Sequence, residues 1–220
     1  AEIGHCPMMS LSATAPTDQS PRPREAEILE AVRHVFAEKG FDGASMQDLA
    51  RAAGMSVGNF YRYFPSKAAM VEEMIRHNLR DAESQFARIV TAPDPIAALR
   101  VGLAMRVNAA SQFCKDAPLR AEITAAALRK PELAAVVGRI ELEITTYLVR
   151  AFAIATELEL EDAWARFASH ARLIVMLIKG SSTRLHVHDA DGEALTKLIL
   201  RQINALLDEV AAACPEKARK

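Results

Sequence analysis

The chain has 220 residues, of which half are apolar and a quarter are charged, and its formal net charge is −1. This composition is typical of a globular protein with a substantial core, and it excludes a polycationic chain that binds nucleic acid by charge alone. No apolar run approaches the roughly 20 residues that a membrane-spanning helix needs, so we expect no membrane contact. The three scattered cysteines have no CxxC or Cys/His spacing, which favours a reducing cytoplasm over a disulfide framework.

The first segment, residues 1–23, is rich in small, polar and proline residues and has no hydrophobic period, so we expect a disordered tail there. A first helix is expected over residues 24–39, where Ile28, Val32 and Phe36 recur at helical spacing. Gly40 is expected to end it, since glycine tolerates the backbone angles that follow a helix.

Residues 45–67 predict two short helices joined by a tight turn. Ser45 and Ser56 can each cap a helix by accepting a hydrogen bond from a free amide of its first turn. Gly54 stands where a helix ends in the left-handed conformation, and Pro65 stops the second helix. This pattern is a helix-turn-helix, which we expect the first helix to hold through a core of Phe36, Leu49 and Phe60, extended by Phe41 and Phe64.

The second short helix predicts a DNA-reading surface. Asn59 and Arg62 are side chains that can bond base edges in the major groove, while hydroxyl and ammonium groups suit phosphate oxygens. No acidic residue occurs between Asp48 and Glu72. The predicted DNA-binding residues are Ser45, Met46, Ser56, Val57, Gly58, Asn59, Tyr61, Arg62, Tyr63 and Lys67.

Residues 24–75 resemble, in one unbroken register, the DNA-binding domain of the TetR-like (tetracycline-repressor) family of bacterial transcription regulators. The resemblance rests on the Gly40-Phe41 turn, on the run from Ala53 to Ser56 and on the run from Gly58 to Lys67. It implies a homodimeric regulator with an N-terminal DNA-binding domain. It also implies an all-helical C-terminal domain that binds a small effector and dimerises.

The rest of the chain also reads as helical. We expect helices over residues 67–90, 96–113, 161–186 and 192–214, one that ends near Arg129 and one that begins at Pro131. The run Thr145–Val149 looks like a strand in isolation, but the long helical period around it overrules that interpretation. The helix that contains residues 173–178 is apolar nearly all round, so we expect it to be buried on more than one side.

The expected fold is therefore all-α, with a three-helix helix-turn-helix domain at residues 24–69 and a larger helical domain for effector binding and dimerisation at residues 70–214. Residues 215–220 form a C-terminal tail. Apolar bundles hold ligands between aromatic and methionine side chains, although the same residues also serve as plain core. The candidate pocket residues are Met105, Phe113, Tyr147, Phe152, Trp164 and Phe167.

The last two expected helices carry apolar stripes that can form a four-helix bundle with a second copy, or can simply cover the chain's own core. We expect the dimer, mainly because the resemblance implies it. The candidate interface residues are Leu173, Leu177, Leu195, Leu198, Ile199, Ile203, Leu206 and Val210.

No cofactor, metal site or catalytic activity is expected. The cluster around His186 and His188 lacks the i, i+4 spacing of a helical zinc site, and no catalytic motif occurs. We therefore predict a cytoplasmic repressor that binds a near-palindromic operator and is released by a small apolar or amphipathic effector. The sequence leaves open an activator, a regulator that senses a partner protein, and a helical small-molecule-binding protein or enzyme whose helix-turn-helix is structural.

Overall fold

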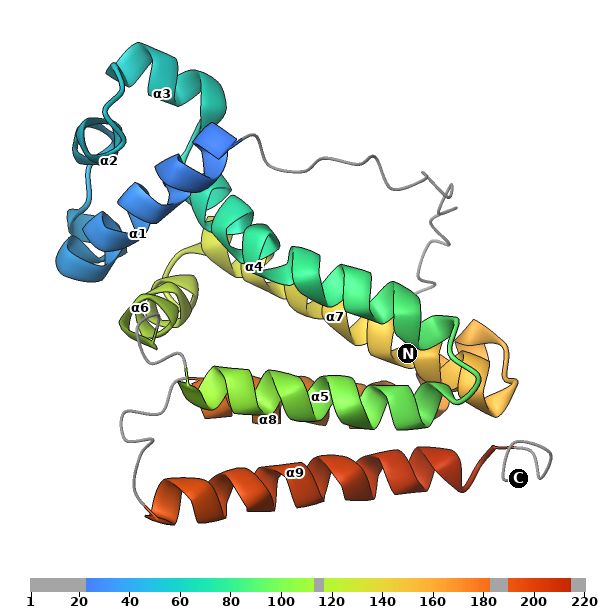
Figure 1. The fold of residues 1–220 in the computed structure, drawn as a ribbon. Helices are drawn as coiled ribbons and strands as arrows, with labels where there is room; N and C mark the ends of the chain where they lie inside the picture. Colours follow the sequence, from blue (N-terminus) through green and yellow to red (C-terminus); the bar gives the residue numbers. More distant parts are fainter. Residues whose placement is uncertain (1–22, 113–116, 183–189, 215–220) are drawn as a thin grey trace, which may run out of the picture.

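The computed structural model describes residues 23–112, 117–182 and 190–214, and within these ranges all regular structure is helical (Figure 1). This confirms the predicted fold class. No described helix is both long and apolar enough to cross a bilayer. The helices are α1 (Pro23–Gly43), α2 (Met46–Ala52), α3 (Val57–Tyr63), α4 (Lys67–Val90), α5 (Pro95–Gln112), α6 (Ala117–Ala127), α7 (Pro131–Thr156), α8 (Leu160–Ser182) and α9 (Ala190–Ala211).

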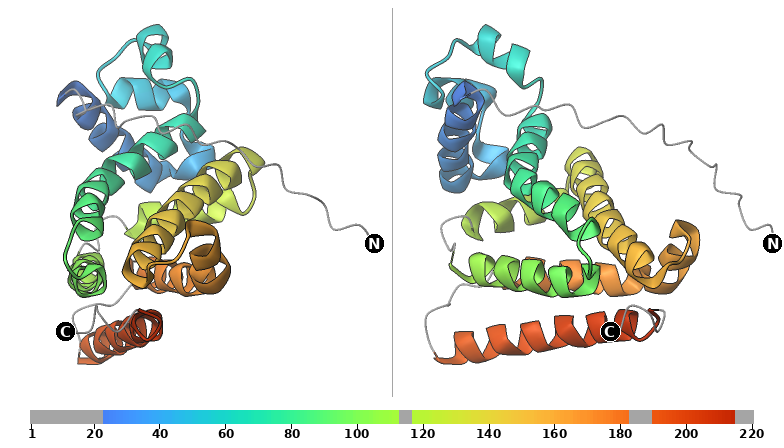
Figure 2. Two further views of the ribbon diagram at one scale, coloured as in Figure 1. Left: turned by 90° about the vertical axis from the view of Figure 1, so that its right-hand side faces the viewer. Right: turned by 45° about the vertical axis from the view of Figure 1, so that its right-hand side comes forward.

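The buried apolar residues form two clusters. The first, which we call the head core, joins α1, α2, α3 and the start of α4, and includes the predicted Phe36, Leu49 and Phe60, each at most 1% exposed. The second, the bundle core, joins α5, α7, α8 and α9. Figures 1 and 2 show α2 and α3 at one end of the molecule and α9 at the other.

Two helices connect these cores. Helix α4 buries Met70, Val71 and Met74 in the head core, while Phe86 and Val90 near its other end pack against the bundle core. Helix α7 buries Leu133 in the head core and Leu148 and Phe152 in the bundle core. Helix α6 lies across α1 and adds Leu119 and Ala126 to the head core. The predicted boundary between residues 69 and 70 therefore falls within α4, a helix that both cores share.

The helix ends follow local chemistry. Gly40 has non-helical angles (φ 69°, ψ 172°), so α1 kinks there and resumes to Gly43 rather than ending at Gly40 as predicted. Lys130 is extended (φ −123°, ψ 112°) because the proline that follows disfavours helical angles at that position. The predicted N-terminal tail covers residues 1–23, but Pro23 already begins α1. The rest of that tail, the predicted tail at residues 215–220 and the His186–His188 cluster lie outside the described residues.

The run Thr145–Val149 is helical, as predicted, and lies in the middle of α7. The hydroxyls of Thr145 and Thr146 donate 2.7 Å hydrogen bonds to the carbonyls of Glu141 and Leu142, one turn earlier. The helix thus satisfies both hydroxyls internally, although β-branched residues alone favour a strand.

Helix α8 differs from its prediction. Ile174 and Val175 are buried in the bundle core, but Leu173 is 43% exposed and Met176 is 67% exposed. The helix is therefore buried on one side only within a single chain. Its apolar residues extend round to a second face that this chain does not cover.

We expect Phe152→Ala to destabilise the protein by about 3–5 kcal/mol, because Phe152 is fully buried in the bundle core and the truncation leaves a cavity. Leu128→Ala is the control, since Leu128 is 86% exposed and its truncation should change stability by no more than about 0.5 kcal/mol. Urea unfolding followed by circular dichroism measures both. Equal effects would mean that the bundle core is not formed as described.

Candidate functional site

The turn between α2 and α3 has the geometry of a helix-turn-helix. Gly54 adopts a left-handed conformation (φ 64°), which glycine reaches without the steric cost that other residues have. The amide of Met55 donates a 2.9 Å hydrogen bond to the carbonyl of Ala50, and the amide of Gly54 donates to that of Arg51. These bonds close the end of α2 and turn the chain into α3.

A serine caps each of the three helices that follow α1. Ser45 and Asp48 form a capping box, in which the serine hydroxyl accepts from the amide of Asp48 and the Asp48 carboxylate accepts from the amide of Ser45. The hydrogen bond from the Ser45 hydroxyl, followed by one from Lys39, holds the pKa of Asp48 well below its usual range. Ser56 and Ser66 cap α3 and α4. The predicted caps at Ser45 and Ser56 are confirmed.

Helix α3 is held by one side chain and exposes the rest. Of its seven residues, only Phe60 is buried, and its ring packs 5.7 Å from that of Phe64. Tyr61 is 47% exposed and Tyr63 is 38% exposed. The guanidinium of Arg62 has no hydrogen bond or ion pair within the described residues. A Cβ added at Gly58 would meet open space. The outer face of α3 is thus available to another molecule.

The ten predicted DNA-binding residues lie together at the start of α2, on α3 and at the start of α4, and none of them is fully buried. Besides Ser56, whose hydroxyl caps α3, two of them have side-chain partners inside the protein. The Ser45 hydroxyl donates to the Asp48 carboxylate at 2.6 Å. The Lys67 ammonium donates to the carbonyls of Phe41 and Ala44 at 2.5 and 3.0 Å and lies over the Phe41 ring. An ammonium has three N–H donors, so a phosphate contact by Lys67 stays a prediction.

The end of α1, after its kink at Gly40, is also held from α6 and the turn after it. The amide of Phe41 donates a 2.8 Å hydrogen bond to the Glu122 carboxylate. Asp42 pairs with Lys130 at 2.6 Å and with Arg129 at 3.6 Å. The hydrogen bond from Lys130 is the main cause that lowers the pKa of Asp42. These contacts fix the position of the head on the rest of the chain.

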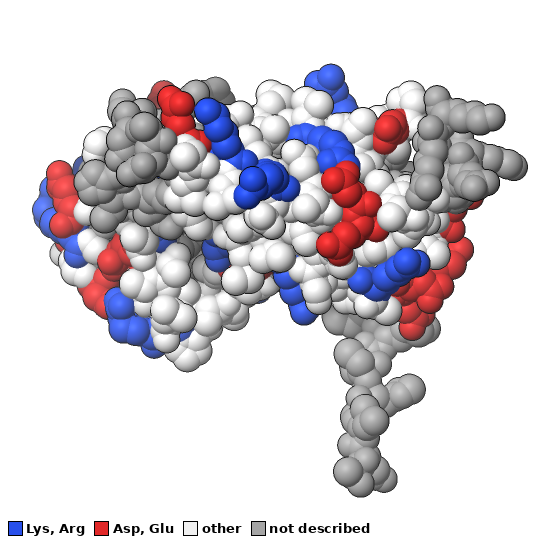
Figure 3. Space-filling view, turned by 90° about the horizontal axis from the view of Figure 1, so that it is seen from below, with Lys and Arg blue, Asp and Glu red and all other residues white. Residues whose placement is uncertain are grey.

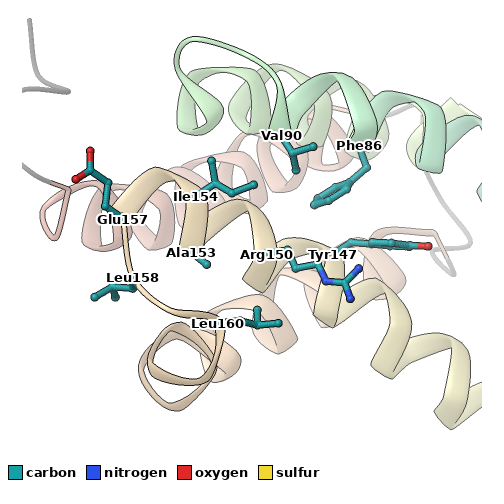
Figure 4. Close-up of a pocket in the computed structure, with 9 residues that line it drawn as sticks. All are labelled: Phe86, Val90, Tyr147, Arg150, Ala153, Ile154, Glu157, Leu158 and Leu160. Atoms are coloured by element: carbon teal, nitrogen blue, oxygen red, sulfur yellow. The ribbon is translucent and has the colours of Figure 1, made fainter. Parts of the chain in front are cut away.

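A groove of about 590 Å³ lies between the end of α4, the second half of α7 and the start of α8 (Figure 4). Apart from Arg150 and Glu157, its walls are mainly apolar. The lining residues are Phe86, Val90, Tyr147, Arg150, Ala153, Ile154, Glu157, Leu158 and Leu160.

Of the six predicted pocket residues, Tyr147 lines this groove. Phe152 and Phe167 are buried in the bundle core, where their rings make an edge contact at 6.1 Å, so they fill space rather than enclose it. Met105 is 58% exposed on α5, Trp164 packs beside the core, and Phe113 lies outside the described residues. Residues that line a pocket and residues that fill a core recur at the same apolar spacing along a helix. The sequence therefore could not tell the two apart.

A profile of the family described as "Bacterial regulatory proteins, tetR family" matches residues 28–74, which cover the helix-turn-helix and the head core around it. The helix-turn-helix domain of this chain is that of the tetR family of bacterial regulatory proteins. The chain is a DNA-binding transcription regulator, in agreement with the exposed outer face of α3.

Two curated relatives are similar to this TetR-family regulator over different lengths. The transcriptional regulator UidR of Escherichia coli (strain K12) is 27% identical over 173 residues, which cover 79% of this chain and 87% of UidR. The transcriptional repressor KstR2 of Rhodococcus jostii is 36% identical over 69 residues, which cover 31% of this chain and 34% of KstR2. The longer match extends well beyond the head.

The fold is similar to that of a solved structure, Salmonella enterica GusR, with a TM-score of 0.63 and 24% identity. The superposition covers 87% of this chain and 100% of GusR. The shared arrangement therefore includes both the head and the helices of the bundle.

The candidate dimer residues of this regulator divide into three sets by their burial. Ile199, Ile203 and Val210 are at most 8% exposed and pack within the chain's own bundle core, so their assignment to an interface is corrected. Leu195 and Leu198 are 41% and 42% exposed on the other side of α9, and Leu173 is exposed on α8. Leu177 and Leu206 are half-buried. The apolar stripe of α9 therefore covers two faces of the helix, one packed in the chain's own core and one exposed.

Sequence reasoning missed the groove residues of α4 and α8, and also Arg150 and Glu122. One signal was present for Arg150, which is the only charged residue between Glu143 and Glu157. No local signal marks Glu122, because its partner Phe41 lies 81 residues away in the sequence. No group of three potential metal-binding side chains occurs among the described residues.

We expect Lys67→Met to destabilise the head by about 1–3 kcal/mol, because the change keeps the apolar stem but leaves the carbonyls of Phe41 and Ala44 without their charged donor. Arg62→Met is the control and should leave stability within about 0.5 kcal/mol, since Arg62 is exposed and unpaired in the described structure. Urea unfolding of the two variants compares them. An unchanged midpoint for Lys67→Met would show that its ammonium is not needed for the fold.

Proposed function

We propose that this TetR-family regulator is a homodimeric repressor that binds a near-palindromic operator through α3 of each subunit. A small molecule bound among the C-terminal helices releases it. The observation that carries the proposal is the outer face of α3, where every residue except the anchor Phe60 is exposed. It acts by binding rather than by catalysis, in the cytoplasm, where bacterial DNA lies.

Each side chain of α3 has a role that follows from its chemistry. Asn59 and Arg62 read bases, because amide and guanidinium groups match base edges in the major groove. Gly58 allows a close backbone approach, since it offers no side chain and faces open space. Ser45, Tyr61, Tyr63 and Lys67 contact phosphates, while Met46, Ser56 and Val57 flank this surface.

A second copy of the chain covers the uncovered apolar face of α8 and α9. Leu173, Met176, Leu195 and Leu198 are each more than 40% exposed, and together they offer the apolar area that an isologous dimer buries. Figure 3 views the molecule from the α9 side, where basic and acidic side chains are scattered with uncharged surface between them. Apolar contact therefore supports association better than charge.

Repression is supported by the name of one relative, the repressor KstR2, which is similar over 69 residues. Release is supported by α4, which has one end in each core. A shift of α4 at its bundle end therefore also moves its start, and with it the adjoining helix α3. An effector can release the protein only through a difference in its affinity for the bound and free states.

Selection of bound fragments from random DNA tests the proposal. We expect an enriched two-fold-symmetric motif whose half-sites lie about 34–36 Å apart, or a multiple of that distance, because two symmetric α3 helices must meet successive major grooves. No enrichment by a folded, dimeric protein would contradict it. Loss of reporter expression in a cell that carries the motif upstream of a promoter would identify a repressor, and a gain would identify an activator.

We expect Arg62→Ala to weaken operator binding by about 1–3 kcal/mol and to relax specificity at one base position, because its guanidinium reads a base. Tyr61→Phe is the comparison, and should weaken binding to all sequences alike because its hydroxyl contacts a phosphate. Fluorescence anisotropy against the operator and its single-base variants measures both. If the two variants lose affinity equally on every sequence, the division into base-reading and phosphate-contacting residues is wrong.

We expect the double variant Leu173→Glu, Met176→Glu to be monomeric, because it places carboxylates on the face that a second copy covers. Sedimentation velocity should show half the mass of the unaltered protein. Leu128→Glu is the control, because Leu128 is 86% exposed at the turn after α6. A double variant that remains dimeric would place the interface elsewhere.

A further inference from the structure

The groove between α4, α7 and α8 has the size of a small-molecule site, since such sites enclose about 300–1,000 Å³. Its apolar walls are partly open to solvent, with Ile154 49% and Leu160 42% exposed. Glu157 ends α7 in the left-handed conformation (φ 54°), which turns the chain so that Leu158 and Leu160 return to the groove. An apolar ligand can therefore gain by covering these side chains.

One cation lines this groove. Arg150 extends from α7 beside Tyr147, whereas Glu157 turns its carboxylate away from the other labelled side chains (Figure 4). Within the described part of the chain, the Arg150 guanidinium has no hydrogen bond or ion pair. A guanidinium presents a planar set of donors that matches a carboxylate or another oxyanion. The groove thus combines an apolar wall with one unpaired anion-binding group.

We propose that this groove binds an amphipathic molecule with a single anionic head, which pairs with Arg150, and that Tyr147 couples its occupancy to α4. The apolar part of the ligand lies along Phe86, Val90 and Ile154. This inference rests on the proposed function, because it names the ligand class of the effector and the site that takes it.

Tyr147 contacts both the groove and the helix that carries the head. Its ring lies 5.1 Å from that of Phe86, on the wall formed by α4. Its hydroxyl donates a 3.2 Å hydrogen bond to Glu143, whose other oxygen lies 3.4 Å from Arg76 of α4. A ligand that displaces the Tyr147 ring therefore disturbs both contacts between α7 and α4.

The chain of contacts continues toward the head. Arg76 bonds Glu72 at 3.2 Å, and Arg139 of α7 bonds the other oxygen of Glu72 at 2.9 Å. Burial raises the pKa of Glu72, but the hydrogen bonds from Arg139 and Arg76 outweigh it and lower the pKa overall. Glu72 is thus held as a carboxylate directly after Met70 and Val71, which are buried in the head core.

Three probes with the same alkyl chain and different head charge test the ligand class: dodecanoate, dodecan-1-ol and dodecyltrimethylammonium, each below its micelle concentration. Titration calorimetry with the full chain and no DNA measures their affinities. We expect dodecanoate to bind roughly tenfold or more tightly than dodecan-1-ol, because charged hydrogen bonds contribute that much, and the ammonium probe to bind most weakly. Each methylene removed from the alkyl chain of the probe should weaken its binding about fourfold.

Variants locate the site. Arg150→Gln should remove the preference for dodecanoate over dodecan-1-ol while leaving the affinity for the alcohol within about twofold. Arg166→Gln, which alters an arginine of α8 outside the groove, should bind all three probes like the unaltered protein. Ile154→Glu should weaken dodecanoate further, because it adds a carboxylate to the groove wall. Equal binding of acid and alcohol, or a preference that survives in Arg150→Gln, would overturn the assignment.

The coupling is tested on the selected operator by anisotropy. Dodecanoate should weaken operator binding by the unaltered protein but not by Arg150→Gln. Tyr147→Phe keeps the ring and removes the hydroxyl, so it should bind dodecanoate within about twofold yet be released less readily. Release of Tyr147→Phe at unaltered dodecanoate concentrations would refute its coupling role. Failure to bind any DNA would instead contradict the proposed function, and calorimetry without DNA would still report on the groove.

Discussion

The arrangement of this protein depends on apolar burial along helices that both cores share. One of them is α7, which buries Leu133 in the head core and Leu148 in the bundle core. Helix α4 begins with Met70, Val71 and Met74 in the head core and ends with Phe86 and Val90 against the bundle core. Apolar burial at both ends means that neither core can shift without moving the helix between them, because packed interiors resist continuous deformation. The α3 surface, which begins one short turn before α4, takes its position from that burial.

A further attachment is polar rather than apolar. Glu122, Lys130 and Lys67 hold the end of α1, after its kink, by hydrogen bonds and an ion pair, and all three come from other parts of the chain. Directional bonds set orientation more sharply than apolar contact does. Together with the apolar burial of α4 and α7, these bonds join the head to the rest of the chain, which is the arrangement that a change in the C-terminal helices needs to act on DNA.

Local rules predicted most of the fold. The serine caps at 45 and 56, the left-handed Gly54 and the stop at Pro65 each depend on residues within one turn, and the structure confirms them. Periodicity found the long helices and rejected a strand at Thr145. It placed Ile199 and Val210 on the wrong side of α9 and assigned Phe152 to a pocket, because apolar spacing does not say which neighbour a face meets.

The sequence by itself determined the helix-turn-helix, the exposed face of α3 and the all-α class, since these follow from capping, turn chemistry and apolar period within short segments. Only the tertiary structure decided that Glu122 bonds the amide of Phe41, that Lys67 serves the fold, and that Arg150 meets Phe86 across a groove. The reason is physical: each of these contacts joins residues far apart in the chain, and the packing of whole helices sets which side chains meet.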